Sequence, residues 1–164
     1  IVSRNSDPKE TLVITVASFN SGHANNVIPK SASLSGTIRY YNDKIGVLAK
    51  RRFFEVVNST CDAFGAKANI NFQKGYPATI NHKKQSEFAY DSAKKIVGNK
   101  ASSSQTPMMG SEDFSYFLKK VPGCFAWIGN GPSASLHNPK YDFNDSVLSI
   151  GSSFLASIAE DRLS

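Results

Sequence analysis

Several residue types are scarce in this 164-residue chain, and each scarcity excludes a class of protein. Its two cysteines, Cys61 and Cys124, are too few for a disulfide framework and lack the Cys-x-x-Cys spacing of zinc or redox sites. A reducing, cytoplasmic location is therefore expected. No apolar run reaches the roughly 20 residues that a membrane helix needs, so we expect no membrane partner.

Recognisable catalytic motifs are also missing. The chain has no Gly-x-Ser-x-Gly elbow for a serine hydrolase, no phosphate-binding glycine loop and no dinucleotide-binding glycine run. His-Glu-x-x-His is absent as well, and the three histidines, His23, His82 and His137, are far apart in sequence. A metal site built entirely from this chain is therefore not expected, because a catalytic zinc takes about three protein ligands.

The charge is unbalanced but not concentrated. Nineteen lysines and arginines against 13 acidic residues give a net charge of +6, in short clusters such as Lys50-Arg51-Arg52 and Lys94-Lys95. Such clusters are typical of the solvated faces of helices. A nucleic-acid-binding function would rest on charge alone, since no aromatic residues alternate with the basic ones, and we expect no nucleic-acid partner.

Hydrophobic periodicity divides the chain into two regions. In the first, the predicted order is strand, strand, helix, strand. The strands span residues 11–19, 32–41 and 68–72. The helix begins after the Asn42-Asp43 cap and is closed by Gly65, with apolar residues at helical spacing between them. Residues 1–4 look like the last turn of an earlier helix.

The second region follows the boundary signal Gly75-Tyr76-Pro77. Helices are predicted over residues 85–97, over 111–118 with Ser111 as the cap, and from about residue 145. A buried strand is predicted over 124–128. Strands and helices in both regions make the expected fold class α/β.

His137 is the first candidate for chemistry. It looks buried among turn residues, between Leu136 and Asn138-Pro139. A histidine in such a loop can offer one ring nitrogen to a metal while an acceptor fixes the other. The alternative is a loop histidine without a role.

Two polar groups form further candidates. Glu112 and Asp113 are predicted in the first turn of a helix, where acidic residues complement the helix dipole or, at a cleft, take a proton. His23, Asn26 and the nearby Asn25 could join Arg39 in gripping a carboxylate. The alternative for Arg39 is a plain surface position on a strand, and no role is expected for His82.

Several motifs in fixed order resemble one enzyme family. They are Ile1–Asn5, Asn26–Pro29, Gly36–Arg39, Gly75–Pro77 and the region from Gly110 to Asp145. Together they resemble the C-terminal half of the zinc-dependent aminoacylase and hippurate hydrolase group (metallopeptidase family twenty), amidohydrolases that cleave N-acyl or N-aminoacyl bonds. The resemblance covers essentially the whole chain.

The resemblance implies two partial domains. Residues 1–80 would be most of a lid or dimerisation domain, an α+β unit with helices on one face of an antiparallel-type sheet. Residues 81–164 would be the closing part of an α/β/α catalytic domain. The opening strand of the lid and most of its first helix would lie upstream.

The resemblance also implies site residues. His137 aligns with the final metal ligand of the family, and Asn26 and Arg39 with lid residues that contact the substrate carboxylate, often across a homodimer. Gly110, Glu112 and Asp113 fall in a motif lining the cleft. His23 stands where many relatives have glycine, and we count it with the cleft.

The implied chemistry is incomplete in this chain. The family uses one or two divalent ions, zinc foremost and manganese or cobalt as alternatives, to activate water against an N-acyl amino acid or small peptide. Most metal ligands and the general-base glutamate belong to the front half, so no catalytic residue is expected here and the chain alone should be inactive. The alternative function is a non-catalytic dimerisation or interaction module derived from the family.

Overall fold

The structure is a computed structural model that describes residues 1–163, and the chain forms two compact units. The first unit comprises Ile1–Ala78 together with Met109–Ser111, and the second comprises Thr79–Met108 and the chain from Glu112 onward. The chain therefore leaves the first unit, returns to it for three residues and leaves again.

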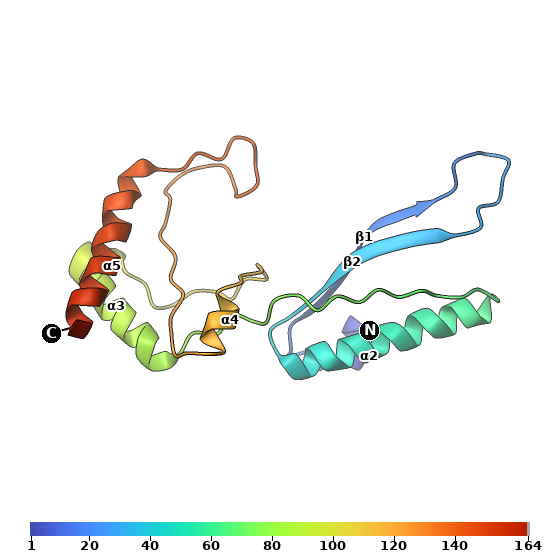
Figure 1. Cartoon of the computed structure of the whole chain (residues 1–164), viewed down its shortest axis with the longest axis horizontal. Coiled ribbons are helices and arrows are strands. Elements are labelled where there is room, and N and C mark those ends of the chain that lie inside the picture. The colour runs from blue at the N-terminus through green and yellow to red at the C-terminus, as the bar shows by residue number, and fades with distance from the viewer. Residues whose placement is uncertain (164) are drawn as a thin grey trace. The chain divides into compact units, whose positions relative to one another are not determined.

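An antiparallel ribbon dominates the first unit (Figure 1). Strand β1 (Leu12–Ser21) pairs with β2 (Ala32–Tyr40), from Leu12 opposite Tyr40 at the base to Ser21 opposite Ala32 at the tip. The register shifts between Val16 and Ser18, so Ala17 is an extra residue that bulges the strand. The short helix α1 (Val2–Asn5) precedes the ribbon and confirms the helical end predicted for residues 1–4.

Helix α2 (Asp43–Ala63) packs on the base of the ribbon. The Asn42 side chain caps it by accepting the Lys44 N–H at 2.9 Å, and Gly65 follows its end at φ +67°, as the sequence predicts. The small core consists of Leu12, Ile45 and Ala49. Only the first turns of α2 bury residues, because the ribbon contacts α2 there and its distal half extends past the core.

The second unit is built on two packed helices, α3 (Lys83–Val97) and α5 (Leu148–Leu163). Asp161 of α5 joins them: its carboxylate accepts hydrogen bonds from Lys95 Nζ at 2.6 and 2.8 Å and from Ser92 Oγ at 3.1 Å. Shorter elements complete the unit: η1 (Gly98–Lys100), α4 (Ser115–Leu118) and η2 (Asp145–Val147). The predicted helices over 85–97 and from about 145 are confirmed.

Two predicted strands are wrong. Residues 68–72 and 124–128 are not strands, and in the second segment Ala126, Trp127 and Ile128 are exposed rather than buried. A strand requires a hydrogen-bonded neighbour, and β1 and β2 pair only with each other among the strands of residues 1–163. Phe72 instead packs by its ring against Phe53 and Phe54 of α2.

No helix within the described part of the chain has the length and apolar character needed to cross a membrane.

Candidate functional site

His137 lies in the first of two consecutive tight turns in the second unit. The Asn138 N–H donates to the Ser135 carbonyl at 3.1 Å, which makes His137 the third residue of a four-residue turn. The Tyr141 N–H donates to the Asn138 carbonyl at 2.9 Å and closes the next turn, with Pro139 at its favoured second position. The Asn138 side chain supports this turn by accepting the Lys140 N–H at 2.8 Å.

The backbone of His137 is unusual. Its φ is +67°, and among residues 1–163 it is the one non-glycine residue with a positive φ. This conformation costs a residue with a Cβ roughly 1–2 kcal/mol, and such outliers gather at functional sites. The side chain is exposed, so the expectation of a buried histidine is wrong. The reason is local, because the turn projects its central residues outward: Leu136 is exposed as well.

The two ends of this loop are held together by side-chain to backbone hydrogen bonds. Asn130 donates through Nδ2 to the Asp142 carbonyl and accepts the Asn144 N–H through Oδ1, both at 2.8 Å. Ser133 Oγ donates to the same Asp142 carbonyl at 3.1 Å and accepts the Asp142 N–H at 3.0 Å. We call Asn130, Ser133 and residues 142–144 the loop clamp.

A similar device holds the preceding extended segment. The Asn81 side chain donates to the Phe125 carbonyl and accepts the Phe125 N–H, both at 2.8 Å. The His82 N–H donates to the Gly123 carbonyl, and His82 Nδ1 accepts the Gly123 N–H, each at 3.1 Å. His82 thus joins this segment to the start of α3 through its backbone and its ring.

Glu112 and Asp113 do not open a helix. Helix α4 begins at Ser115 with Phe114 as its N-cap residue, and the expected cap by Ser111 is wrong. Glu112 is half-buried, and its Oε1 accepts the Phe114 N–H at 3.0 Å. The carbonyl of Asp113 accepts the Tyr116 N–H at 2.9 Å. The two acidic residues therefore form a turn directly before α4, and neither lies in its first turn as predicted.

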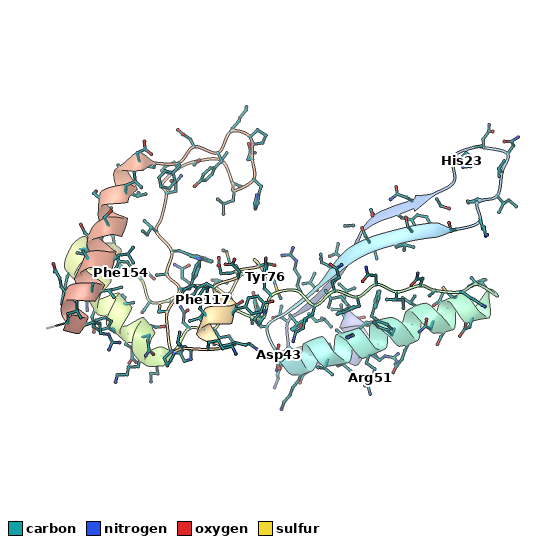
Figure 2. The ribbon with its side chains drawn as sticks, viewed as in Figure 1. His23, Asp43, Arg51, Tyr76, Phe117 and Phe154 are labelled. Atoms are coloured by element: carbon teal, nitrogen blue, oxygen red, sulfur yellow. The ribbon has the colours of Figure 1, made fainter. Side chains whose placement is uncertain are left out.

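The candidates in the first unit lie at opposite ends of the ribbon. His23 and Asn26 belong to the loop that joins the tips of β1 and β2, and Figure 2 shows His23 there. Arg39 pairs with Val13 near the base. The strand from Ala32 to Arg39 spans on the order of 20 Å at about 3.3 Å per residue. One chain therefore cannot bring the Arg39 guanidinium and the Asn26 amide to the same carboxylate, and the expectation of a single grip is wrong.

Arg39 has a partner of its own. Its Nη1 donates to the Met109 carbonyl, in the three-residue segment that returns to this unit. Gly110 follows directly, and a Cβ at this glycine would meet nothing within 4 Å. Arg39 is exposed, and its guanidinium has further N–H donors in the planar arrangement that suits a carboxylate.

The described residues do not make up a metal site. Throughout residues 1–163, no three histidine, cysteine, aspartate or glutamate side chains come together as ligands. One imidazole does not hold a divalent ion in a catalytic geometry, so the donor set does not fit a self-contained metal centre.

Sequence reasoning missed the loop clamp. Asn130 follows the segment predicted as a strand over 124–128, and only the structure shows that its side chain reaches residues 142–144. The available signal was the asparagine itself, whose amide can donate and accept a hydrogen bond at once.

Comparison with known proteins gives consistent relatives over nearly the whole chain. An IAA-amino acid hydrolase (ILR1-like 4) from Arabidopsis thaliana is 33% identical, covering 97% of this chain and 38% of the relative. Hippurate hydrolase from Campylobacter jejuni is 32% identical, covering 97% and 42%. N-acetyl-L-cysteine deacetylase from Bacillus subtilis is 31% identical, covering 99% and 39%. The chain therefore spans about two fifths of the length of these relatives.

Solved structures agree with this relationship in fold. An aminohydrolase from methicillin-resistant Staphylococcus aureus superposes with a TM-score of 0.79 at 26% identity, covering 96% of this chain and 40% of that one. A dinuclear metal-binding M20 peptidase from Bacillus subtilis superposes with a TM-score of 0.76 at 24% identity, covering 90% and 41%. Residues 1–161 match the sequence model of peptidase family M20/M25/M40, and the chain belongs to this family.

Proposed function

We propose that this chain is part of a metal-dependent amidohydrolase that cleaves the amide bond of N-acyl or N-aminoacyl amino acids, with hippurate-type compounds or small peptides as substrates. Family membership and the names of the relatives support the reaction class. A divalent ion, zinc foremost and manganese or cobalt as alternatives, is part of the proposal. The two free cysteines favour a cytoplasmic location.

The observation that carries this proposal is the backbone of His137. A positive φ at a histidine is unfavourable, and here two turns and the loop clamp maintain it. A loop histidine without a role needs no such support. We assign His137 as a metal ligand contributed to a site whose other ligands, and whose general base, are not in this chain.

Arg39 and Asn26 would bind the substrate carboxylate, with His23, Gly110, Glu112 and Asp113 lining the cleft. Arg39 already donates to a neutral carbonyl, and a carboxylate is the stronger acceptor for the same guanidinium. Because Asn26 lies at the far end of the ribbon, we propose that a homodimer brings the Asn26 of one copy to the Arg39 of the other.

The first test asks whether the chain acts alone. Purified protein with hippurate or N-acetyl amino acids should release no product above the blank, with zinc, manganese or cobalt added. Full-length Campylobacter jejuni hippurate hydrolase serves as the positive control. Sustained turnover by the isolated chain would overturn the assignment of an incomplete site.

The second test supplies the missing part. In a chimera, residues 1–161 of this chain replace the matching C-terminal region of that hippurate hydrolase. We expect metal-dependent hydrolysis that His137→Ala reduces by more than about 100-fold, while Ser103→Ala in an exposed loop leaves it unchanged. A chimera that retains full activity after His137→Ala would contradict the assignment of a ligand.

The homodimer has its own test in the same chimera. The variants Asn26→Ala and Arg39→Ala should each lose most activity when made alone. Mixing the two under conditions that allow subunit exchange should restore part of it, because one site of the mixed dimer regains both residues. Failure of the mixture to recover any activity would argue against a shared site.

The alternative, a non-catalytic dimerisation or interaction module, is favoured by the uncovered apolar end of the ribbon. Val16, Phe19 and Leu34 lie on the face that α2 covers at the base, yet they are 61%, 67% and 62% exposed. Such a patch is prone to self-association. Sedimentation at micromolar concentration should show oligomers that the Phe19→Ser/Leu34→Ser variant dissociates. A parent chain that is only monomeric would count against this function.

A further inference from the structure

The loop clamp encloses the one strained histidine of the described chain. His137 lies midway between Asn130 and Asn144, which the clamp ties to each other. On the C-terminal side the tie continues into a helix, since Asn144 Oδ1 accepts the N–H and the hydroxyl of Ser146 at 3.1 and 2.7 Å. This bond caps η2, which leads directly into α5. The loop is therefore anchored to the helical frame of its unit.

The Asn130 and Ser133 side chains of the clamp each donate and accept a backbone hydrogen bond. The Asn130 amide uses its donor and its acceptor on backbone groups two residues apart, as a neighbouring strand would. Ser133 uses donor and acceptor on the two backbone groups of one residue, Asp142. Together the two side chains fix the position and direction of the returning backbone. No pairing partner from a strand fixes this segment within residues 1–163.

We infer that Asn130 and Ser133 are positioning residues, which hold His137 at positive φ and so aim its imidazole. This inference rests on the proposed function, because aiming matters only if the imidazole binds something. The physical reason is that a turn alone leaves the central φ free to relax toward negative values. Closing both ends of the loop removes that freedom, because relaxation at His137 would have to displace residues 142–144.

Solution NMR of the isotope-labelled chain tests this without metal or substrate. In the parent, the three-bond coupling between Hα of His137 and the carbonyl carbon of Leu136 should report a positive φ, because the two nuclei are trans only there, and the amides of Asp142 and Asn144 should exchange slowly. In Asn130→Ala/Ser133→Ala, the coupling should average and both amides should exchange about tenfold faster or more. Continued protection of α3 and α5 amides shows that the unit stays folded.

Conservative variants separate positioning from general stability. Ser133→Thr keeps the hydroxyl and should retain the parent coupling at His137. Asn130→Asp keeps the acceptor for the Asn144 N–H but loses the donor to Asp142, so its coupling should lie between the parent and the double variant. Ser153→Ala, at an exposed serine of α5, is the matched control and should leave the His137 signal unchanged.

A His137 coupling identical in parent and double variant, with α3 and α5 protected, would overturn the inference. The outcome is independent of the hydrolase assays. An inactive chimera combined with a shifted coupling would reject the proposed function and keep the positioning role. An active chimera combined with a His137 coupling that is unchanged in the double variant would support the proposed function and reject the positioning role.

Discussion

The loop around His137 and the loop at the ribbon tip both carry candidate residues, and they are held in different ways. The first is tied by the clamp and contains two tight turns. The tip loop is joined at its base by Ser21 Oγ, which donates to the Ser31 carbonyl at 3.0 Å. Within the described chain, the side chains of His23 and Asn26 have no hydrogen-bond partner.

This difference matches the chemistry proposed for each loop. A metal ligand has to meet a fixed bond length and direction, so a rigid support is useful. A residue that recognises a flexible substrate, or crosses to a second subunit, can adapt on contact. We therefore expect the His137 loop to be more rigid than the tip loop. The following variants test this difference.

The largest effect is expected at Gly36, which supports the tip loop through the ribbon. A Cβ on Gly36 would lie 2.0 Å from the carbonyl oxygen of Thr15, opposite the bulge. The Thr15 carbonyl is part of the strand backbone and cannot move aside as a flexible side chain could. Gly36→Ala should therefore lower the free energy of unfolding of the first unit by about 3 kcal/mol. Urea unfolding followed by circular dichroism measures this.

Two controls confine that effect to the ribbon. Gly75→Ala, where a Cβ meets nothing within 4 Å, should shift the unfolding free energy by less than about 0.5 kcal/mol. Trp127, the sole tryptophan of the sequence, lies in the second unit, so its fluorescence transition should be the same in all three proteins. Equal destabilisation by both alanines would mean that the bulge is not the tight point.

The sequence predicts those features of the fold that depend on contacts between residues close together in the chain. Helix α2 was predictable because Asn42, Gly65 and the apolar spacing all act within a few residues. The tight turn at Asn138-Pro139 follows from the same kind of local chemistry. The wrong strand at 124–128 failed because strand formation depends on a distant partner, which periodicity cannot supply.

The candidate site shows the same limit. The sequence drew attention to His137, but neither its positive φ nor its support by Asn130 is written in neighbouring residues. Likewise, Arg39 and Asn26 looked like one grip until the register of β1 and β2 placed them at opposite ends of the ribbon. Long-range pairing decides both cases, and residue spacing does not encode it.

A matched pair of glycines compares the two loops directly. Gly131 has φ +78° and Gly22 has φ +74°, and an added Cβ would lie 3.8 Å from Asn144 Nδ2 and 3.7 Å from Pro29 Cγ. The intrinsic strain of alanine is therefore similar at both positions, about 1 kcal/mol. Gly131→Ala should cost about 1–2 kcal/mol because the clamp resists relaxation, and Gly22→Ala less than about 0.5 because the tip can shift.

Unfolding free energies from urea titration measure that pair, with Trp127 fluorescence for Gly131→Ala and circular dichroism for Gly22→Ala. The ranking is the informative result. If Gly22→Ala proves as costly as Gly131→Ala, the tip loop is as rigid as the clamped loop and the contrast fails.

The smallest effect concerns the far end of α5, whose start the clamp secures. The hydrogen bond from Lys95, with a second from Ser92, holds the pKa of Asp161 below its usual 3.8. The folded state thus favours the ionised carboxylate, so its contribution to stability is present above about pH 4 and is lost as pH falls through the lowered pKa. Asp161→Asn should give a slightly lower Tm than the parent at pH 7, and this difference should shrink in acid.

Asp161→Asn also tests whether the loop clamp depends on the packing of α3 against α5. Because Asn144 is bonded to Asn130 and Ser146, and not to residues near Asp161, its amide exchange should be unchanged in Asp161→Asn. Lys95→Met, which removes the partner charge, is the control and should behave alike. Faster exchange at Asn144 in either variant would show that the helix pair, and not the clamp alone, keeps the His137 loop rigid.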